Sequence, residues 1–231
     1  MKYLFLPFEQ HSDFGFGEVA RSFQESAERL ALDAHNKPLM NSQFPVNYLY
    51  RHSIELYLKS CIINIHRYLN NGSIKVSDIR IGEKQQLISN MHSIKSLFQH
   101  FRGLVVDNKA IIEIEKRTKW SEIPGELSAF IEDIESYDSR STYFRYPGLD
   151  LTQVELEKSS MKEVDSKDLQ GMVESGNKIF TYVEVNDKNE IEKAYILDRA
   201  VLGKCQESLK EVAGILSGAS VGIRMELANG E

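Results

Sequence analysis

The sequence predicts a mainly α-helical protein, an antiparallel helical bundle with a small β-hairpin in its C-terminal third. The strongest evidence is the stretch of residues 44–71, in which apolar side chains recur at helical spacing throughout. Several shorter segments have the same periodicity. Residues 178–185 and 191–198 are instead rich in β-branched and aromatic side chains and are separated by a polar loop, which is typical of a β-hairpin.

Residues 44–71 are expected to form the central helix of the bundle. Pro45 suits a first helical turn, where its missing N–H is no loss, and the Asn-Asn-Gly run ending at Gly72 is a stop signal. At about 100° per residue, the apolar side chains cover an arc of roughly 220°, which implies several packing partners. The remaining sector carries a stripe of ionisable residues, namely Arg51, His52, Glu55, Lys59 and His66.

This charged stripe has two interpretations. Arg51, Glu55 and Lys59 lie four residues apart, so they can form i,i+4 ion pairs on a solvated face, each contributing a few tenths of a kcal/mol. Alternatively, the stripe faces a cleft or a second subunit, where Arg51 and His52 would meet an anionic ligand. The spacing alone does not decide between them.

The other helices follow at intervals along the chain. An amphipathic helix is expected over residues 18–35, a third helix begins near His92, and a short one is expected within 107–119. Another helix starts near Pro124, and the last spans roughly 198–216. The short connection between the first two helices favours antiparallel neighbours.

No internal repeat or low-complexity linker divides the chain. Residues 1–231 are therefore expected to form one domain, with a hairpin at 178–197 inserted before the last helix. No apolar run approaches 18 residues, so no membrane span is expected, and the N-terminus has no secretory signal, so we expect a cytoplasmic protein. Cys61 and Cys205 are isolated and predict neither a disulfide framework nor a zinc site.

Charge and motifs exclude several classes of function. The net charge is −6, and the acidic excess lies late in the chain, over residues 150–193, so no broad basic footprint for duplex nucleic acid is expected. The sequence has no Gly-rich phosphate-binding loop, no His-Glu-x-x-His and no Gly-x-Ser-x-Gly. The carboxylates show no ligand spacing. We therefore expect no cofactor and no bound metal.

Three motifs together resemble the HEPN superfamily of prokaryotic helical-bundle proteins. They are YLYRHSIELYLKS at 48–60, MHSIKSLF at 91–98 and FRYP at 144–147. The resemblance covers roughly residues 18–147 together with the final helix. It implies an antiparallel bundle of four or five helices that is usually a homodimer. It also implies membership of a group that includes metal-independent endoribonucleases of toxin–antitoxin and anti-phage defence systems, along with non-catalytic relatives.

The chain departs from the catalytic members in one respect. Those proteins carry an Arg-x(4-6)-His motif on a late helix, whereas here no histidine follows Arg145, because the last one is His100. Residues Arg29 and His35 have the right spacing but lie in the first helix. This departure leaves two expectations open: a ribonuclease that uses other residues, or a non-catalytic module that binds a partner protein, encoded by a neighbouring gene, or a nucleotide.

The expected site combines the central helix with two later segments. Metal-free RNA cleavage needs a base for the 2′-hydroxyl, an acid for the leaving oxygen and a cation for the phosphate. His52 is the first acid/base candidate and His92 the second, while Arg51 and Arg145 would contact phosphate. Glu55 would orient these groups. Lys59 and Tyr146 complete the expected substrate-binding set.

Structural roles compete with these assignments. His92 could cap the start of the third helix, and Arg145 could bridge to the carboxylate of Glu55 and lock two helices together. Tyr146 and Pro147 could simply mark a helix stop, because proline disfavours helix at the residue before it.

Overall fold

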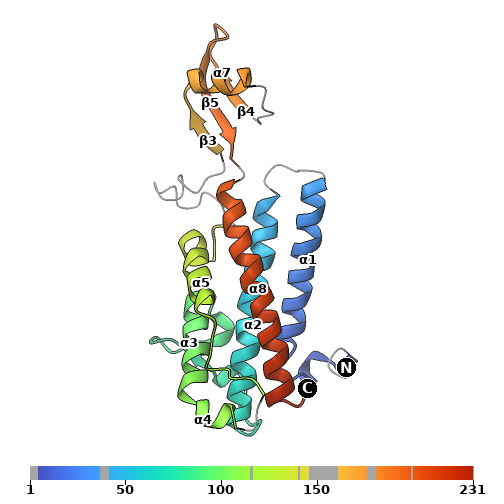
Figure 1. The fold of residues 1–231 in the computed structure, drawn as a ribbon. Coiled ribbons are helices and arrows are strands. Elements are labelled where there is room, and N and C mark those ends of the chain that lie inside the picture. Colours follow the sequence, from blue (N-terminus) through green and yellow to red (C-terminus); the bar gives the residue numbers. More distant parts are fainter. Residues whose placement is uncertain are drawn as a thin grey trace. The chain divides into compact units, whose positions relative to one another are not determined.

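The computed structural model describes residues 5–36, 42–114, 117–139, 141–145, 161–175, 181–198 and 200–230. The chain divides into two compact units, a helical unit of Met1–Pro147 with Cys205–Glu231, and a second unit of Gly148–Lys204. The described part is mainly helical and has two small antiparallel sheets (Figure 1), which confirms the predicted mainly α class. The single-domain assignment over residues 1–231 stays a prediction.

The helical unit is a bundle built around α2. Its long helices are α1 (Phe16–Asn36), α2 (Gln43–Leu69), α3 (Ile94–Asp107), α5 (Gly125–Asp138) and α8 (Ala200–Leu227), which enters the unit at Cys205. A short α4 (Lys109–Ile112) follows α3. Helix α2 packs against α1 and α3 and runs beside α8 (Figure 1), as the wide apolar arc predicts.

Burial along α2 shows why it is central. Ile54, Leu58 and Ile62 are each 0% exposed. Full burial of one such side chain contributes about 1.5–3 kcal/mol to folding. The apolar arc of α2 therefore supplies much of the hydrophobic driving force of the helical unit.

The ends of α2 agree with the sequence signals. Pro45 lies in its first turn, and the chain leaves the helix through Asn71 and Gly72, whose φ angles are 50° and 78°. The Gly72 N–H donates to the Arg67 carbonyl oxygen at 2.7 Å. This left-handed termination is the one that Asn and Gly favour.

The last helix is longer than expected. Helix α8 continues to Leu227 instead of ending near residue 216. Gly218, near which the sequence predicted the end, lies within the helix. Gly222 also lies within it, against the ring of Trp120, where an added Cβ would come within 2.6 Å of the ring. Gly222 thus permits the close approach of the Trp120 ring to α8, a role that a search for helix stops does not detect.

A buried carboxylate joins the start of α1 to α2 and α8. Asp13 is 0% exposed, and its side chain accepts hydrogen bonds from the N–H groups of Gly15 at 3.0 Å and Gly17 at 2.8 Å. Ser60 of α2 donates to Asp13 at 2.5 Å, and Ser60 and Ser220 lie 3.0 Å apart. The N–H groups that a helix start leaves free are thus satisfied inside the core.

The connection between α2 and α3 carries the smaller sheet. Strands β1 (Arg80–Ile81) and β2 (Gln86–Leu87) pair antiparallel. Helix α3 then begins at Ile94, and its N-cap is Ser93, whose hydroxyl accepts from the Ser96 N–H at 3.1 Å. The proposed capping role of His92 is therefore wrong, because the neighbouring serine performs it.

The second unit contains the predicted hairpin and one more strand. Strands β4 (Thr181–Val185) and β5 (Ile191–Leu197) pair antiparallel, which confirms the hairpin, and β3 (Met161–Val164) pairs with the other edge of β5. Helix α7 (Ser166–Glu174) contacts β5. The turn between β4 and β5 is stabilised by Asn186, whose side-chain oxygen accepts from the N–H groups of Lys188 and Glu190.

Among the residues that the structure describes, no helix is long and apolar enough to cross a membrane.

Candidate functional site

Three residues of the charged stripe of α2 are buried, which overturns the interpretation of the stripe as a solvated face. Arg51, Glu55 and Lys59 are each only 2% exposed. Glu55 lies between the two cations, 2.9 Å from the Lys59 Nζ through Oε1 and 3.5 Å from the Arg51 Nη1 through Oε2. Burying charges is costly unless they are paired and hydrogen-bonded, and these are.

A second carboxylate, Asp138 at the end of α5, completes the pairing of Arg51. The Arg51 Nε lies 2.9 Å from the Asp138 Oδ2, and Asp138 is 3% exposed. The Asp138 Oδ1 accepts from the N–H groups of Thr142 at 2.7 Å and Tyr143 at 2.9 Å. Asp138 was not among the predicted site residues, because no spacing in the sequence links it to Arg51.

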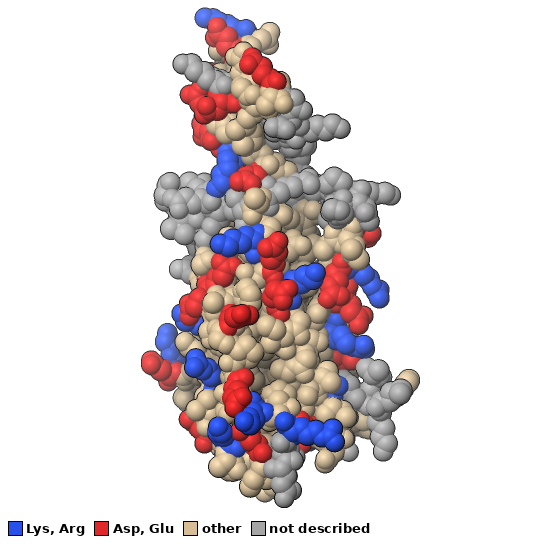
Figure 2. Space-filling view, viewed as in Figure 1, with Lys and Arg blue, Asp and Glu red and all other residues tan. Residues whose placement is uncertain are grey.

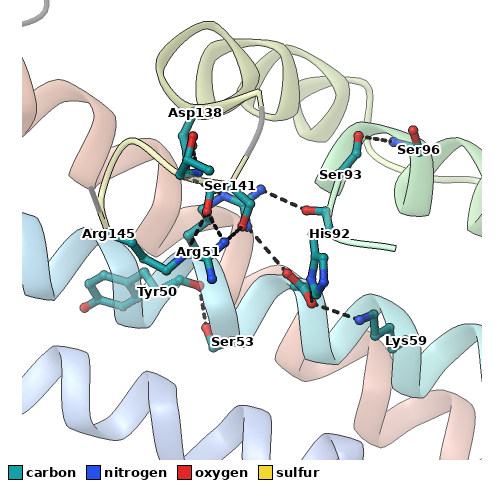
Figure 3. A network of polar contacts seen from close by, with 12 residues as sticks. Tyr50, Arg51, Ser53, Lys59, His92, Ser93, Ser96, Asp138, Ser141 and Arg145 are labelled. Carbon is teal, nitrogen blue, oxygen red and sulfur yellow. Dashed lines mark hydrogen bonds and ion pairs between the residues drawn. The ribbon is translucent and has the colours of Figure 1, made fainter. Parts of the chain in front are cut away.

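Two cations of the stripe, Arg51 and Lys59, also hydrogen-bond to the segment that leads into α3 (Figure 3). The Arg51 Nη2 donates to the His92 carbonyl oxygen at 2.9 Å, and the Lys59 Nζ donates to the Ser89 carbonyl oxygen at 3.4 Å. The His92 Nδ1 lies 3.0 Å from the Glu55 Oε1. Residues from α2, α5 and the α3 entry thus meet in one network, which we call the Glu55 network: Arg51, Glu55, Lys59, His92 and Asp138.

His92 is the exposed member of the Glu55 network. Its side chain is 54% exposed, whereas that of Glu55 is 3% exposed. Since the carboxylate of Glu55 can only accept, the proton that they share belongs on the Nδ1 of His92 in the neutral imidazole. The Nε2 of that ring then carries the lone pair and is the atom able to exchange a proton with a ligand.

The network shifts the pKa values of its two carboxyl groups in opposite directions. Burial alone would raise the pKa of Glu55, but the charge and hydrogen bond of Lys59, together with His92, hold this pKa below its usual value. Burial raises the pKa of Asp138, outweighing the opposite effects of Arg51 and the Tyr143 and Thr142 amides. Glu55 is therefore ionised at neutral pH and can orient the imidazole of His92.

His52 lies in a different environment. Its ring meets that of Phe23 edge-on at 4.5 Å between centroids and stacks on Tyr48 at 5.8 Å. Burial is the largest cause that lowers the pKa of His52; Glu55 opposes it, whereas the cations Lys59, Arg51 and Arg145 act in the same direction as burial. His52 is thus a neutral imidazole that packs among aromatic rings. The charged residues nearby influence its pKa.

Arg145 is exposed and bound to its own turn. Its Nε donates to the Ser141 carbonyl oxygen at 2.7 Å, and its Nη2 donates to the same oxygen. Figure 3 shows Arg51 between Arg145 and His92. Of the remaining predicted residues, Tyr146 lies outside the described residues, as does the side chain of His35.

The structure therefore brings together most of the predicted site. Arg51, Glu55, Lys59 and His92 form one network. The charge of Arg145 acts on two neighbouring groups, because it favours a lower pKa for both Asp138 and His52. In the described part of the chain, no group of three or more His, Cys, Asp or Glu side chains is arranged to hold a metal ion.

Comparisons of the chain with protein-family models, with curated proteins and with solved structures found no match. The resemblance to the HEPN superfamily therefore rests on the three sequence motifs alone.

Chemically, the Glu55–His92 pair is suited to proton transfer. An ionised buried carboxylate that fixes the tautomer and orientation of a solvent-facing imidazole is the arrangement that general acid–base catalysis uses. Arg51 and Lys59 keep the carboxylate charged, and Arg145 provides an exposed cation whose charge acts on Asp138 and His52.

Proposed function

We propose that this chain is a HEPN-like protein that acts on RNA as a metal-independent endoribonuclease in a prokaryotic defence or toxin–antitoxin system in the cytoplasm. The observation that carries the proposal is the Glu55–His92 pair, with its buried carboxylate and solvent-facing imidazole. His92, and not His52, is then the main acid/base group, because the ring of His52 is packed between Phe23 and Tyr48.

In the proposed reaction, the Nε2 of His92 takes the proton of a ribose 2′-hydroxyl. The 2′-oxygen attacks the adjacent phosphorus, the bond from phosphorus to the 5′-oxygen breaks, and an acid protonates that oxygen, leaving a 2′,3′-cyclic phosphate. Arg145 is the cation that contacts the phosphate. Arg51 has a different role from the expected one, because Glu55, Asp138 and the His92 carbonyl oxygen already engage its guanidinium.

A homodimer fits this chemistry. The reaction needs a base and an acid at the same time. The Glu55 network of one chain presents a single exposed imidazole. A second copy that brings its own His92 to the same RNA would provide the other group.

RNA incubated with the purified protein in the presence of EDTA tests the proposal. His92→Ala should slow cleavage by about 10²–10⁴-fold, the usual contribution of a general acid or base. Arg145→Gln should also slow cleavage, whereas His52→Ala should have a smaller effect. Arg102→Gln, at an exposed position of α3, is the matched control for loss of an arginine. Cleavage that persists unchanged in both His92→Ala and Arg145→Gln would rule out this site.

A second candidate function is a non-catalytic interaction module that binds a partner protein or a nucleotide. It is favoured by the apolar side chains that the second unit exposes, with Tyr182 54% and Val185 53% exposed. It is also favoured by the pairing of the buried charges with one another, because buried charges that only hold helices together would have to be paired in this way. The product of a neighbouring gene, co-expressed and co-purified with the wild type but not with Tyr182→Ser/Val185→Ser, would support this function.

A further inference from the structure

The helical unit has a cavity at the end where α2 and α8 finish. Its volume is about 370 Å³. It is lined by the loop before α1 and by the last turns of both helices, through Ser12, Asn64, Arg67, Tyr68, Asn71 and Asn229 among others. Ligand sites commonly have volumes of about 300–1,000 Å³. Along α2 this cavity is about 14 Å beyond Glu55, nine residues at 1.5 Å each, so it is separate from the Glu55 network.

The cavity is formed by two helix ends of the same type. Asn71 and Gly72 end α2 with φ angles of 50° and 78°, and Asn229 and Gly230 end α8 with φ angles of 52° and 79°. The Gly230 N–H donates to the Arg224 carbonyl oxygen at 3.1 Å, as Gly72 does to Arg67 at 2.7 Å. Because both terminations are hydrogen-bonded, the walls of the cavity are preformed and would lose little entropy on binding a ligand.

Asn64 is the unusual residue of this cavity. It is 1% exposed, yet neither its side-chain oxygen nor its side-chain nitrogen has a hydrogen-bond partner among the residues that the structure describes. Buried amides are nearly always hydrogen-bonded, because an unpaired one loses its solvation without compensation. Asn64 is among the residues that line the cavity, and its unpaired amide has two N–H donors and a carbonyl acceptor for a ligand that reaches this wall.

Arg67, one turn further along α2, brings a positive charge to the same wall. Its Nη1 donates to the carbonyl oxygens of Ser12 at 3.0 Å and His11 at 3.4 Å, and its guanidinium lies 5.1 Å from the centre of the Phe14 ring. These contacts fix the guanidinium, and no carboxylate of the described residues pairs with it. Its other N–H groups are those suited to bind a carboxylate or a phosphate.

We propose that this cavity binds a small organic anion that carries neutral hydrogen-bonding groups. The anionic group, a phosphate monoester or a carboxylate, contacts Arg67, and a hydroxyl or amide of the same molecule pairs with Asn64. Asn64, Arg67 and Tyr68 lie at i, i+3 and i+4, so one face of the last turns of α2 presents them, and Asn71 follows in the turn that ends the helix.

Isothermal titration calorimetry with chosen probes tests this site. Glycerol 3-phosphate and malate each combine an anionic group with a hydroxyl, whereas inorganic phosphate lacks the hydroxyl and glycerol lacks the charge. We expect one of the first two to bind with a Kd of about 1 mM or tighter, inorganic phosphate to bind more weakly, and glycerol not to bind. Saturable binding of glycerol equal to that of the anions, or no binding of either anionic probe, would overturn the proposal.

Variants then assign the contacts. Asn64→Leu should weaken binding by about tenfold, the effect of one lost hydrogen bond to a charged or polar ligand. It should also raise the melting temperature, because it removes an unpaired buried amide. Arg67→Gln should abolish binding, with Arg67→Lys intermediate and Arg102→Gln as the unchanged control. Binding that is equal in wild type, Asn64→Leu and Arg67→Lys would show that these side chains do not form the site.

Discussion

Among single side chains, Glu55 is the one that pairs with both buried cations of α2. Two cations, Arg51 and Lys59, and two carboxylates, Glu55 and Asp138, are each 2–3% exposed and form a cluster with no net charge. Such a cluster contributes little net stability over an apolar core, but removing one member leaves its partners buried without compensation. The energetic consequence of a substitution therefore depends on the partner left behind.

Glu55→Gln should lower the free energy of unfolding by about 3–5 kcal/mol, because it leaves Lys59 and Arg51 buried with one carboxylate fewer. Chemical denaturation followed by circular dichroism measures this loss. The control is Glu132→Gln, since the side chain of Glu132 is 60% exposed and pairs with the exposed Lys95. That change should cost less than about 1 kcal/mol. Equal losses in the two variants would contradict the buried ion-pair network.

The sequence predicted most of the residues that form this network, but it did not predict that they are buried. The four-residue spacing of Arg51, Glu55 and Lys59 placed them on one stripe, which the structure confirms. Whether the stripe meets solvent depends on Asp138, more than eighty positions beyond Arg51 in the chain. Periodicity within one helix contains no information about such a distant partner, so burial of the stripe could not be predicted.

Between elements, α2 and α3 are joined by a pair of histidines, one in the last turn of α2 and one in the middle of α3. The Nε2 atoms of His66 and His100 lie 3.2 Å apart, and the two rings stack with centroids 5.5 Å apart. Burial and the charge of His100 lower the pKa of His66 to about 4, and burial lowers the pKa of His100. A contact of this kind holds only while at least one ring is neutral.

The free energy of unfolding should therefore fall as the pH decreases from about 6.5 to 4. In the unfolded chain these histidines bind protons near pH 6.5, whereas in the folded chain His66 stays neutral down to about pH 4. Over this range the unfolded state binds more protons, so acid favours it. Denaturation at pH 7.5, 6.0 and 5.0 measures the effect, with His66→Gln/His100→Gln as the comparison. A pH dependence that is unchanged in the double variant would show that other groups cause it.

The elements themselves were predictable where their signals are local. The long apolar periodicity of α2 and the β-branched and aromatic residues of β4 and β5 lie within each segment, and both predictions are confirmed. Strand β3 was missed because it has only four residues in a polar stretch, and its partner β5 begins about thirty residues later. Its formation is decided by long-range pairing and not by its own composition.

At the level of the whole chain, the candidate site and the hairpin belong to different compact units. The Glu55 network lies within Met1–Pro147, and the exposed apolar side chains of β4 and β5 lie within Gly148–Lys204. The helical unit also has its own core from α8, where Leu209, Val212, Ala213 and Leu216 are 0% exposed. The two proposed functions thus depend on parts of the chain that can be altered separately.

Replacing residues 148–198 by a flexible Gly/Ser linker of about twelve residues should leave the helical unit folded. The physical reason is that the buried contacts of α8 from Cys205 onward are made within that unit. Far-UV circular dichroism and a cooperative thermal transition measure this directly. RNA cleavage should then persist if the Glu55–His92 pair carries the activity, and capture of a partner should be lost if the second unit carries the function. A shortened chain that shows no cooperative transition would contradict the assignment of an independent core to the helical unit.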